Sequence, residues 1–594
     1  MAFTPLSGAL GKKRAAHLLR RACGGASPSE IDRIAAMTTA QAMDELVQTG
    51  LTTPAPPIDP ETGSEWVTSG ATDGVNSGEF HLSQFLVRWT LAQMLATDVD
   101  EAQKLSYSFR ERITLFYHTL FTSKISKIRS RGQYFQGALF RFFAFDEEDT
   151  VVTPPESTPT NPLPDETHPV NLKQLTKKIS IENGMLIFLD GRQNVKGSPN
   201  ENYARELLEL YSIGRGLEGH LPKGDGPGDY VYFTEEDVQA GAKVLSGFNV
   251  DNSYSNFDRQ TGLPIGVVKN NGNSHDYSTK TFSKRFGNAT IAPDNQIITD
   301  GGTQEDQMID EVGQLVDLIY DQDQTPIHIC RKLYRFFVYH EVTPATESGI
   351  IADMAAILVS NDYKIIPVLK ALFSSEEFYD GAAGVADNYY GSLIKSPIDL
   401  CIGFFKNFDL TIPSPESDLD GYYNSLGEIQ GAIGSQGMSF YEPFEVAGYS
   451  AFHQFPIYNR SWITTNYLTN RYDFVRARMV KIADIETGEF SPFEFVRDNF
   501  GAVASDAKSL IIALAEYYLP LQSDLTFSVS TDSELTTERL NYFLSAFLMN
   551  PQIDTDPEAA WTNRWNNGLD LEVREVQLMN LFNAMMQTPE YQLM

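Results

Sequence analysis

The chain has 594 residues, of which 42% are hydrophobic and 12% aromatic, so it can bury a large globular core. Its 46 Lys and Arg residues against 78 Asp and Glu residues give a formal net charge of −32, which disfavours binding to nucleic acid phosphates and to anionic membranes. The three cysteines, Cys23, Cys330 and Cys401, are far apart and odd in number, so the sequence contains no disulfide framework or cysteine-rich metal motif.

No apolar run approaches the length of a membrane span, and the basic residues at 12–14 are not followed by the apolar core of a signal peptide. We therefore expect no membrane span and, by default, a cytoplasmic location. We also expect no nucleic acid partner. The sequence leaves open whether there is a protein partner, and it leaves the oligomeric state open too.

Apolar residues recur at i, i+3 and i+4 along most of the chain, which predicts a mainly α-helical fold. Two of the helices also carry start signals, because Ser27 with Glu30 forms a capping pattern and Thr234 precedes three acidic residues that suit a helix N-terminus. The predicted helices cover residues 15–21, 29–49, 82–96, 100–121, 125–144, 170–181, 202–213, 234–245, 304–321, 325–337, 349–359, 365–372 and 396–405.

Extended structure is sparse and concentrated between residues 263 and 299. Residues 263–269, 282–291 and 296–299 predict short strands, separated by Asn-Gly and Pro-Asp turn signals. A small antiparallel β insertion in the helical body accounts for this pattern.

Differences in composition and periodicity along the sequence divide the chain into three parts. Segments 54–76 and 146–169 predict long irregular loops, and because helical periodicity resumes beyond each of them, residues 1–412 are expected to form one helical main body. Residues 413–461 are rich in glycine and aromatic side chains and predict an irregular segment. Residues 462–594 return to helical periodicity, and we expect them to pack on the main body.

Residues 200–211 (Asn-Glu-Asn-Tyr-Ala-Arg-Glu-Leu-Leu-Glu-Leu-Tyr) form the stretch of the chain that is densest in side chains capable of chemistry. Ser198 and Glu201 predict a capping box, with Pro199 at the first helical position and Gly214 as the stop signal. We therefore expect one short, well-delimited helix.

The carboxylates of this helix allow two interpretations. Glu206 and Glu209 share a polar stripe beside the apolar stripe, and such a stripe can line a cleft. Alternatively, the role is structural, because Arg205 stands four residues from both Glu201 and Glu209, a spacing typical of helix ion pairs.

Short motifs occur along the chain in an order that is typical of one protein family. They are His17-Leu18-Leu19-Arg20-Arg21, Phe116-Tyr117-His118, Phe188-Leu189-Asp190-Gly191, Asn200 to Tyr211, Thr234-Glu235-Glu236-Asp237, Ser246-Gly247-Phe248, His275-Asp276, Lys395-Ser396-Pro397 and Pro589-Glu590-Tyr591-Gln592-Leu593. With these motifs the chain resembles, from about Leu10 to its C-terminus, a bacterial family catalogued only as a domain of unknown function, number eighteen hundred in that series. The resemblance implies a large, mostly helical protein that is frequently exported, and it implies no particular activity.

The chain also departs from the pattern of that family. Members usually carry Trp-His-Asn-His where this chain has Tyr117-His118-Thr119-Leu120, so a second histidine is replaced by Leu120. If that histidine were a metal ligand in the family, this chain would lack it.

Five residues are candidate ligands for a divalent metal ion: Asp190, Glu206, Glu209, His275 and Asp276. The helix at 200–211 lacks the Glu-x-x-His pairs of carboxylate-bridged helical metal sites, so this pattern is weak. The cofactor is left open, with a divalent metal ion as its one candidate.

Two functional classes follow from these residues. In a hydrolase-like enzyme with a polar cleft around the 200–211 helix, Glu206 or Glu209 would act as general base while Arg205, His118 or His275 would stabilise negative charge. In a non-catalytic binding or assembly protein, the same Glu, Arg and His side chains would form a buried network. We favour the second class.

Overall fold

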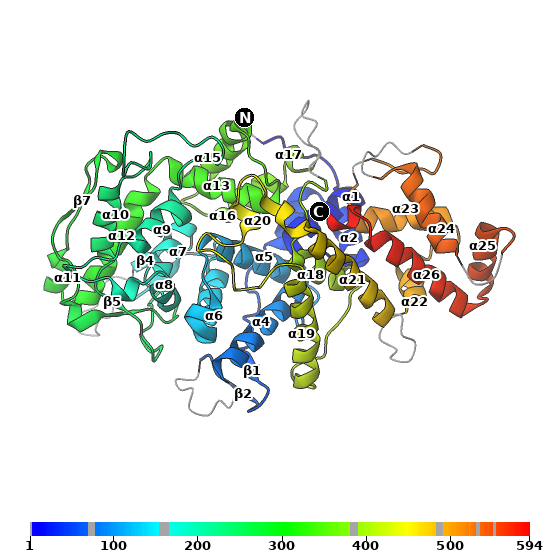
Figure 1. Cartoon of the computed structure of the whole chain (residues 1–594), viewed down its shortest axis with the longest axis horizontal. Helices are drawn as coiled ribbons and strands as arrows, with labels where there is room; N and C mark the ends of the chain where they lie inside the picture. The colour runs from blue at the N-terminus through cyan, green and yellow to red at the C-terminus, as the bar shows by residue number, and fades with distance from the viewer. Residues whose placement is uncertain are drawn as a thin grey trace.

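A computed structural model of the chain describes residues 3–68, 78–153, 166–379, 390–482, 491–521, 523–529, 535–549 and 554–594. In these ranges helices dominate, and strands form only small two-stranded antiparallel sheets, joined by irregular loops (Figure 1). The predicted mainly α-helical fold is confirmed.

The N-terminal half holds the helices that later form the candidate site. Its elements are α1 (Gly11–Cys23), α2 (Pro28–Ala35), α3 (Thr39–Leu46), β1 (Ile58–Asp59), β2 (Ser64–Glu65), α4 (Glu79–Leu95), α5 (Lys104–Leu120), α6 (Ile125–Phe142), β3 (Thr150–Val152), β4 (Glu166–His168), α7 (Leu172–Ile179), α8 (Asn183–Phe188), α9 (Asn202–Glu206), the π-helix η2 (Leu207–Ser212), α10 (Glu235–Val244) and β5 (Phe248–Asn249).

The C-terminal half continues with short strands and then helices only. Its elements are β6 (Val267–Val268), β7 (Lys280–Thr281), β8 (Thr290–Ile291), α11 (Asn295–Thr299), α12 (Gln304–Tyr320), α13 (Gln324–Phe337), α14 (Pro344–Thr346), α15 (Ala352–Ser360), α16 (Ile365–Phe373), α17 (Glu376–Tyr379), α18 (Pro397–Asn407), α19 (Leu419–Ser435), α20 (Ser450–His453), the 3-10 helix η6 (Tyr458–Ile463), α21 (Thr465–Ile482), α22 (Pro492–Phe500), α23 (Ala507–Tyr518), α24 (Thr537–Leu548), α25 (Pro557–Asn567) and α26 (Leu571–Met586).

Helix α5 is the centre of the elongated molecule. It contacts α1, α3, α4, α6 and α13, and every side chain from Leu105 to His118 is buried. At one end of the molecule lie α10 to α12 with strands β5 and β7, and at the other end lie α22 to α26 (Figure 1). Because α5 is surrounded on all sides, any charged side chain on it must find a partner inside the protein.

Two predicted helix start signals are confirmed, and one predicted helix is divided into two. Ser27 with Glu30 forms the expected capping box of α2, and Thr234 with Asp237 forms that of α10. The predicted helix 29–49, however, is two helices. Thr38 adopts an extended conformation and its side chain caps α3, so the chain turns between α2 and α3.

The β insertion is present but smaller than predicted. Strand β5 pairs with β6, and β7 pairs with β8, each pair antiparallel. The predicted strand at 296–299 is wrong, because this segment is the helix α11. Its start is set by the Asp294 side chain, which accepts a hydrogen bond from the Gln296 amide at 2.8 Å.

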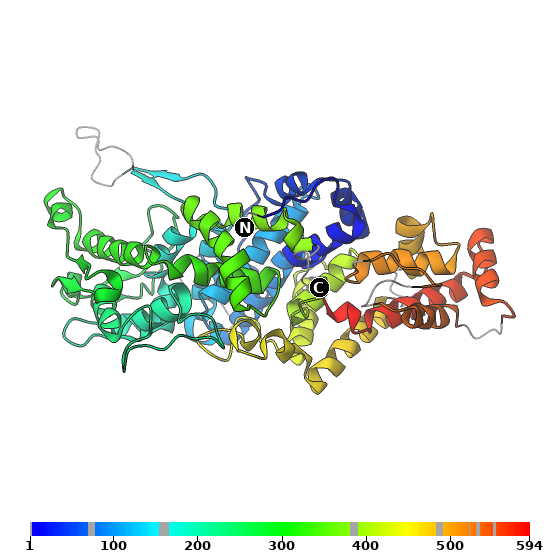
Figure 2. The ribbon, with the colours of Figure 1, turned by 90° about the horizontal axis from the view of Figure 1, so that it is seen from above.

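Each of the two expected loop insertions contains a small hairpin. Strands β1 and β2 pair within 54–76, and β3 pairs with β4 within 146–169. Residues 69–76 and 154–165 of these two segments lie outside the described ranges. Seen from above, the β3–β4 hairpin extends away from the helical body (Figure 2).

The expectation of an irregular segment at 413–461 is wrong for its first half, which contains the 17-residue helix α19. Tyr422, Leu426, Ile429 and Ile433 are buried along one face of that helix. Because several glycines interrupt this segment, its helical apolar periodicity was not recognised in the sequence. At Gly427 a Cβ atom would lie 3.1 Å from the guanidinium carbon of Arg88 on α4, so glycine permits close packing of the two helices.

Residues after 462 pack against the N-terminal part of the chain. Tyr517 on α23 donates a hydrogen bond to Asp32 on α2 at 2.6 Å. Phe408, just after α18, stacks on Tyr518 and contacts Phe582 edge-on. These contacts bury aromatic area between the two parts of the chain.

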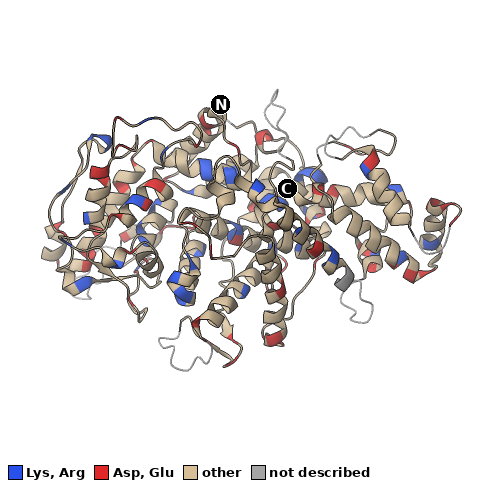
Figure 3. Ribbon diagram, in the orientation of Figure 1, with Lys and Arg blue, Asp and Glu red and all other residues tan. Residues whose placement is uncertain are grey.

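None of the helices in the described part of the chain has both the length and the apolar character that a membrane span requires. Lys and Arg are interspersed with Asp and Glu over the helices and are not segregated into separate regions (Figure 3).

Candidate functional site

The helix predicted at 200–211 starts later than its sequence signals indicate. Ser198 forms a β-bridge with Val195, so it is not the helix cap, and α9 begins at Asn202. The Asn200 side chain accepts a hydrogen bond from the Asn202 amide at 3.0 Å, and the Asn194 side chain accepts one from the Asn200 amide at 3.0 Å. This asparagine turn holds the preceding residues out of the helix.

Arg205 forms an ion pair with a different helix. Its guanidinium donates to Glu235 on α10 at 2.7 and 3.0 Å and to the Tyr230 hydroxyl at 2.8 Å, while Glu201 lies 3.4 Å away. Glu209 is not among its partners and pairs with Arg215 at 2.6 Å. Of the two predicted ion pairs of Arg205, the one with Glu201 is therefore confirmed, and the one with Glu209 is wrong. The side chain of Arg205 is 28% exposed, so this network is not sealed from water.

Glu206 lies half-buried on the same helix. Burial, together with the neighbouring charge of Glu209, raises the pKa of Glu206 to about 6. No hydrogen bond or ion pair joins Glu206 or Glu209 to His118 or His275 in the described part of the chain.

After Glu206 the chain widens into the π-helix η2, a feature that often marks functional sites. Nε2 of His328 on α13 lies 3.1 Å from the Leu210 carbonyl oxygen, and in the tautomer with a proton on Nε2 it donates a hydrogen bond there. Burial lowers the pKa of His328 well below its usual value. No motif in the sequence around His328 indicated that this side chain would contact the π-helix.

His118 lies in an apolar environment at the end of α5. Its ring contacts the rings of Phe440, Tyr441 and Tyr449, and its side chain is buried. Burial lowers its pKa to about 3, so the imidazole is neutral at physiological pH. The aromatic stretch after residue 440 thus packs on α5 as well.

His275 belongs to a fully buried cluster of ionisable groups. Its Nδ1 lies 2.7 Å from the Ser246 carbonyl oxygen, and its Nε2 lies 3.3 Å from a carboxylate oxygen of Glu311 on α12. The Lys280 ammonium pairs with the same oxygen of Glu311, and all three side chains have no exposed area. Such a sealed cluster suits a structural role.

The remaining predicted metal ligands lie in turns. Asp190 has φ 58° and accepts a hydrogen bond from the Gln193 amide side chain, and Asp276 accepts two from Ser278. Within the described residues, no three His, Cys, Asp or Glu side chains come together in a group that could hold a metal ion.

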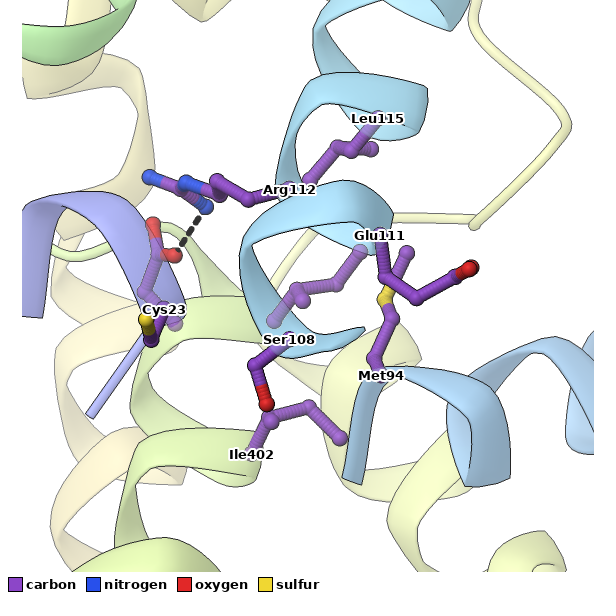
Figure 4. Close-up of a pocket in the computed structure, with 10 residues that line it drawn as sticks. Cys23, Met94, Ser108, Glu111, Arg112, Leu115 and Ile402 are labelled. Carbon is purple, nitrogen blue, oxygen red and sulfur yellow. Dashed lines mark hydrogen bonds and ion pairs between the residues drawn. The ribbon is translucent and has the colours of Figure 1, made fainter. Parts of the chain in front are cut away.

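Three consecutive charged residues on α5 were not among the site residues predicted from the sequence. Arg110, Glu111 and Arg112 are 7%, 1% and 7% exposed. Glu111 and Arg112 leave the helix in different directions, and Arg112 reaches Asp399 on α18 (Figure 4). A run of three charges in a helix otherwise rich in apolar and aromatic residues was the available signal, because buried charge is rare without a partner.

Glu111 makes a two-point ion pair with Arg141 on α6, with N–O distances of 2.7 and 2.8 Å. Burial alone would raise the pKa of Glu111, but the Arg141 guanidinium outweighs it and the pKa is lowered. Arg110 lies 3.5 Å from the same carboxylate and donates to the Thr52 carbonyl oxygen at 3.2 Å. Its Nη2 atom makes no hydrogen bond within the described residues.

Arg110 and Arg141 line a cavity of about 460 Å³. Its walls come from the segment after α3, from α4 to α6, from β3 and from residues 170 and 261–263. The lining side chains are mostly apolar or aromatic, and the acidic ones are Glu147 and Glu148. They are Leu51, Thr53, Pro54, Trp89, Arg110, Tyr134, Ala138, Arg141, Phe142, Glu147, Glu148, Thr150, Val170, Thr261 and Leu263, with Gly50.

The two arginines make cation–π contacts with aromatic side chains at or near the cavity. The Arg141 guanidinium lies 5.2 Å from the Trp89 ring centre, and that of Arg110 lies 4.3 Å from the centre of Tyr107. The Trp89 indole donates to the Ala55 carbonyl oxygen at 3.0 Å, which ties the segment after α3 to α4. These contacts hold Arg110, Arg141 and Trp89 in place at the cavity.

The fold and this cavity define a class of protein: a helical body with an arginine-lined cavity beside its central helix. The chain matches the family described as protein of unknown function DUF1800 over residues 17–593, and it belongs to that family. No curated protein and no solved structure matches it.

Proposed function

We propose that this protein is a non-catalytic binding protein whose cavity beside α5 binds an organic carboxylate. The observation that carries the proposal is Arg110, a buried guanidinium that lines the cavity and whose Nη2 has no hydrogen-bond partner among the described residues. A carboxylate matches the planar donor geometry of arginine and forms strong, charge-assisted hydrogen bonds with it.

The size and walls of the cavity suit a small organic molecule. Its volume of about 460 Å³ falls in the range of ligand pockets, which are typically apolar with a few polar anchors. Trp89, Tyr134 and Phe142 supply aromatic surface for the apolar part of such a ligand.

The charges around the cavity disfavour a polyanion. Glu111 makes its two-point ion pair with Arg141 and lies 3.5 Å from Arg110, so Arg110 is the less fully paired cation of the two. Glu147 and Glu148 would repel a second negative charge, which argues against nucleotides and other polyanions.

The lining favours binding over catalysis. The described lining residues include no histidine, cysteine or serine, so the cavity lacks a Ser or Cys nucleophile paired with a histidine base. Arg141, which lines the cavity, is held by its ion pair with Glu111 behind it.

Isothermal titration with phenylacetate and its neutral analogue phenylacetamide tests the proposal. We expect the native protein to bind phenylacetate at least about tenfold more tightly, because only the carboxylate engages Arg110. Arg110→Met keeps an unbranched, apolar side chain but removes the guanidinium, and it should abolish this preference.

Arg259→Met is the matched control, since Arg259 is a half-exposed arginine paired with Asp306 and does not line the cavity. It should leave the preference unchanged. Equal binding of the two compounds by the native protein, or an undiminished preference in Arg110→Met, would contradict the proposal.

The hydrolase alternative keeps one supporting observation. The raised pKa of Glu206, about 6, suits a general base near neutral pH. Hydrolysis of a panel of ester and amide substrates that is lost in Glu206→Gln and kept in Arg110→Met would favour this alternative. Its metal-dependent form would also require bound metal, which elemental analysis of the purified protein measures.

A further inference from the structure

Four acidic residues in succession, Asp146 to Asp149, follow helix α6. The first and the last of them attach this run to the rest of the protein. The Asp146 carboxylate accepts a hydrogen bond from the Ile366 amide at 2.6 Å. The Asp149 carboxylate accepts one from the Val170 amide at 3.3 Å and pairs with Lys364 at 3.3 Å. Because both ends are attached, the two residues between them are restrained.

These two inner residues, Glu147 and Glu148, line the cavity beside α5. Both are exposed, and neither makes a hydrogen bond or an ion pair with another described residue. Water solvates most exposed carboxylates, but these two are adjacent, restrained and part of the wall of a largely apolar cavity. Two neighbouring negative charges repel each other, so a cation bound beside them would be favoured.

The positive and negative charges of the cavity lie at different depths. Arg110 is only 7% exposed, whereas Glu147 and Glu148 are exposed to solvent. The guanidinium therefore lies inside the protein and the two carboxylates lie at the mouth of the cavity. Most of the remaining lining is apolar or aromatic.

The lining suits an organic ammonium group better than a metal ion. The rings of Trp89 and Tyr134 are 5.6 Å apart, and the faces of such rings attract an ammonium group. A calcium ion needs six to eight oxygen ligands. Among the described residues, no three His, Cys, Asp or Glu side chains are grouped so that they could hold a metal ion.

We infer that the ligand of this cavity is a zwitterion in which an apolar body separates an ammonium group from the carboxylate. The inference rests on the proposed function, because Arg110 binds the carboxylate. The ammonium group would pair with Glu147 and Glu148 at the mouth, and the apolar body would contact the aromatic walls. Two kinds of molecule have this chemistry: a short apolar peptide, and an amino acid whose amine is at the end of its chain.

Isothermal titration with two pairs of compounds measures the contribution of the ammonium group. The first pair is 4-(aminomethyl)phenylacetate and the isosteric 4-ethylphenylacetate, and the second is the dipeptide alanyl-phenylalanine and its N-acetyl derivative. In at least one pair, we expect the native protein to bind the zwitterion at least about fivefold more tightly, the contribution of a partly exposed ion pair. The pair that shows this preference identifies the kind of ligand.

The double variant Glu147→Gln, Glu148→Gln should abolish this preference and bind the compounds without an ammonium group no more weakly than the native protein does. Glu236→Gln combined with Glu572→Gln is the matched control, because it removes two negative charges at exposed positions that do not line the cavity. It should keep the preference. No preference in either pair, or a preference that persists in the Glu147 and Glu148 variant, would overturn the inference.

Arg110→Met separates this inference from the proposed function. If it weakens the binding of 4-ethylphenylacetate while the ammonium group adds nothing in either pair, the proposed function holds and only the inference falls. If the preference depends on Glu147 and Glu148 but Arg110→Met binds every compound as the native protein does, the cavity binds amines. That result would overturn both the proposed function and the zwitterion.

Discussion

Arg141 holds the buried carboxylate of Glu111 by two hydrogen bonds of 2.7 and 2.8 Å, in the middle of the protein. The pair joins α6 to the central helix α5, and its Arg141 lines the cavity that we assign to ligand binding. Because Glu111 is 1% exposed, its charge is stabilised by Arg141 and Arg110 and not by water.

Glu111→Gln should destabilise the protein by about 3 to 5 kcal/mol, because it leaves buried guanidinium groups without their counter-charge. Urea unfolding followed by circular dichroism measures the change. Glu494→Gln, which alters a 63% exposed carboxylate, should change the free energy of unfolding by less than about 0.5 kcal/mol. A midpoint for Glu111→Gln equal to that of the native protein would show that the pair is not stabilising.

Arg205→Ala should cost only about 1 kcal/mol, although Arg205 contacts Glu235 and Tyr230. The side chains of Arg205 and Glu235 are each about 30% exposed, and solvent screening weakens such pairs. A double-mutant cycle with Glu235→Ala in urea unfolding isolates the pair. A coupling above about 3 kcal/mol would indicate a desolvated network instead.

Gly214→Ala should destabilise by about 2 to 5 kcal/mol. Gly214 has φ 71°, which costs an alanine about 1 to 2 kcal/mol, and a Cβ atom there would lie 2.8 Å from Cε1 of His328, so overpacking adds to the cost. Gly568→Ala is the control, because φ there is 64° with open space around it, and only the backbone cost should appear. Equal losses in the two variants would mean that His328 moves aside freely.

Glu206 should make stability depend on pH in a definite direction. Its folded-state pKa of about 6 lies above its ordinary value of 4.5, so the folded protein holds the proton more tightly than the unfolded chain does. The native protein should therefore lose stability relative to Glu206→Gln as pH rises from about 4.5 to 6, by about 1 kcal/mol after screening. Chemical unfolding of both proteins across this pH range measures the difference, and a pH-independent difference would refute the raised pKa.

Local signals in the sequence were sufficient for most of the helices. The apolar periodicity of the segments that became α4 to α6, α12 and α13 is set within a few turns, and the caps at Ser27 and Thr234 involve residues three apart. The family resemblance likewise rested on short contiguous motifs, and the match over residues 17–593 confirmed it. The start signal at Ser198 failed because Ser198 and Asn200 take part in a turn with Val195 and Asn194.

Tertiary structure alone decided which charged groups meet. His275 and Glu311 are 36 positions apart, Arg112 and Asp399 are 287 apart, and no periodicity relates residues over such distances. The sequence drew attention to the carboxylates of α9, yet the buried charge lies on α5, because helix packing determines which side chains are removed from water and must be paired. Composition and periodicity thus determined the helical class of this protein, whereas packing decided where its cavities and buried charges lie.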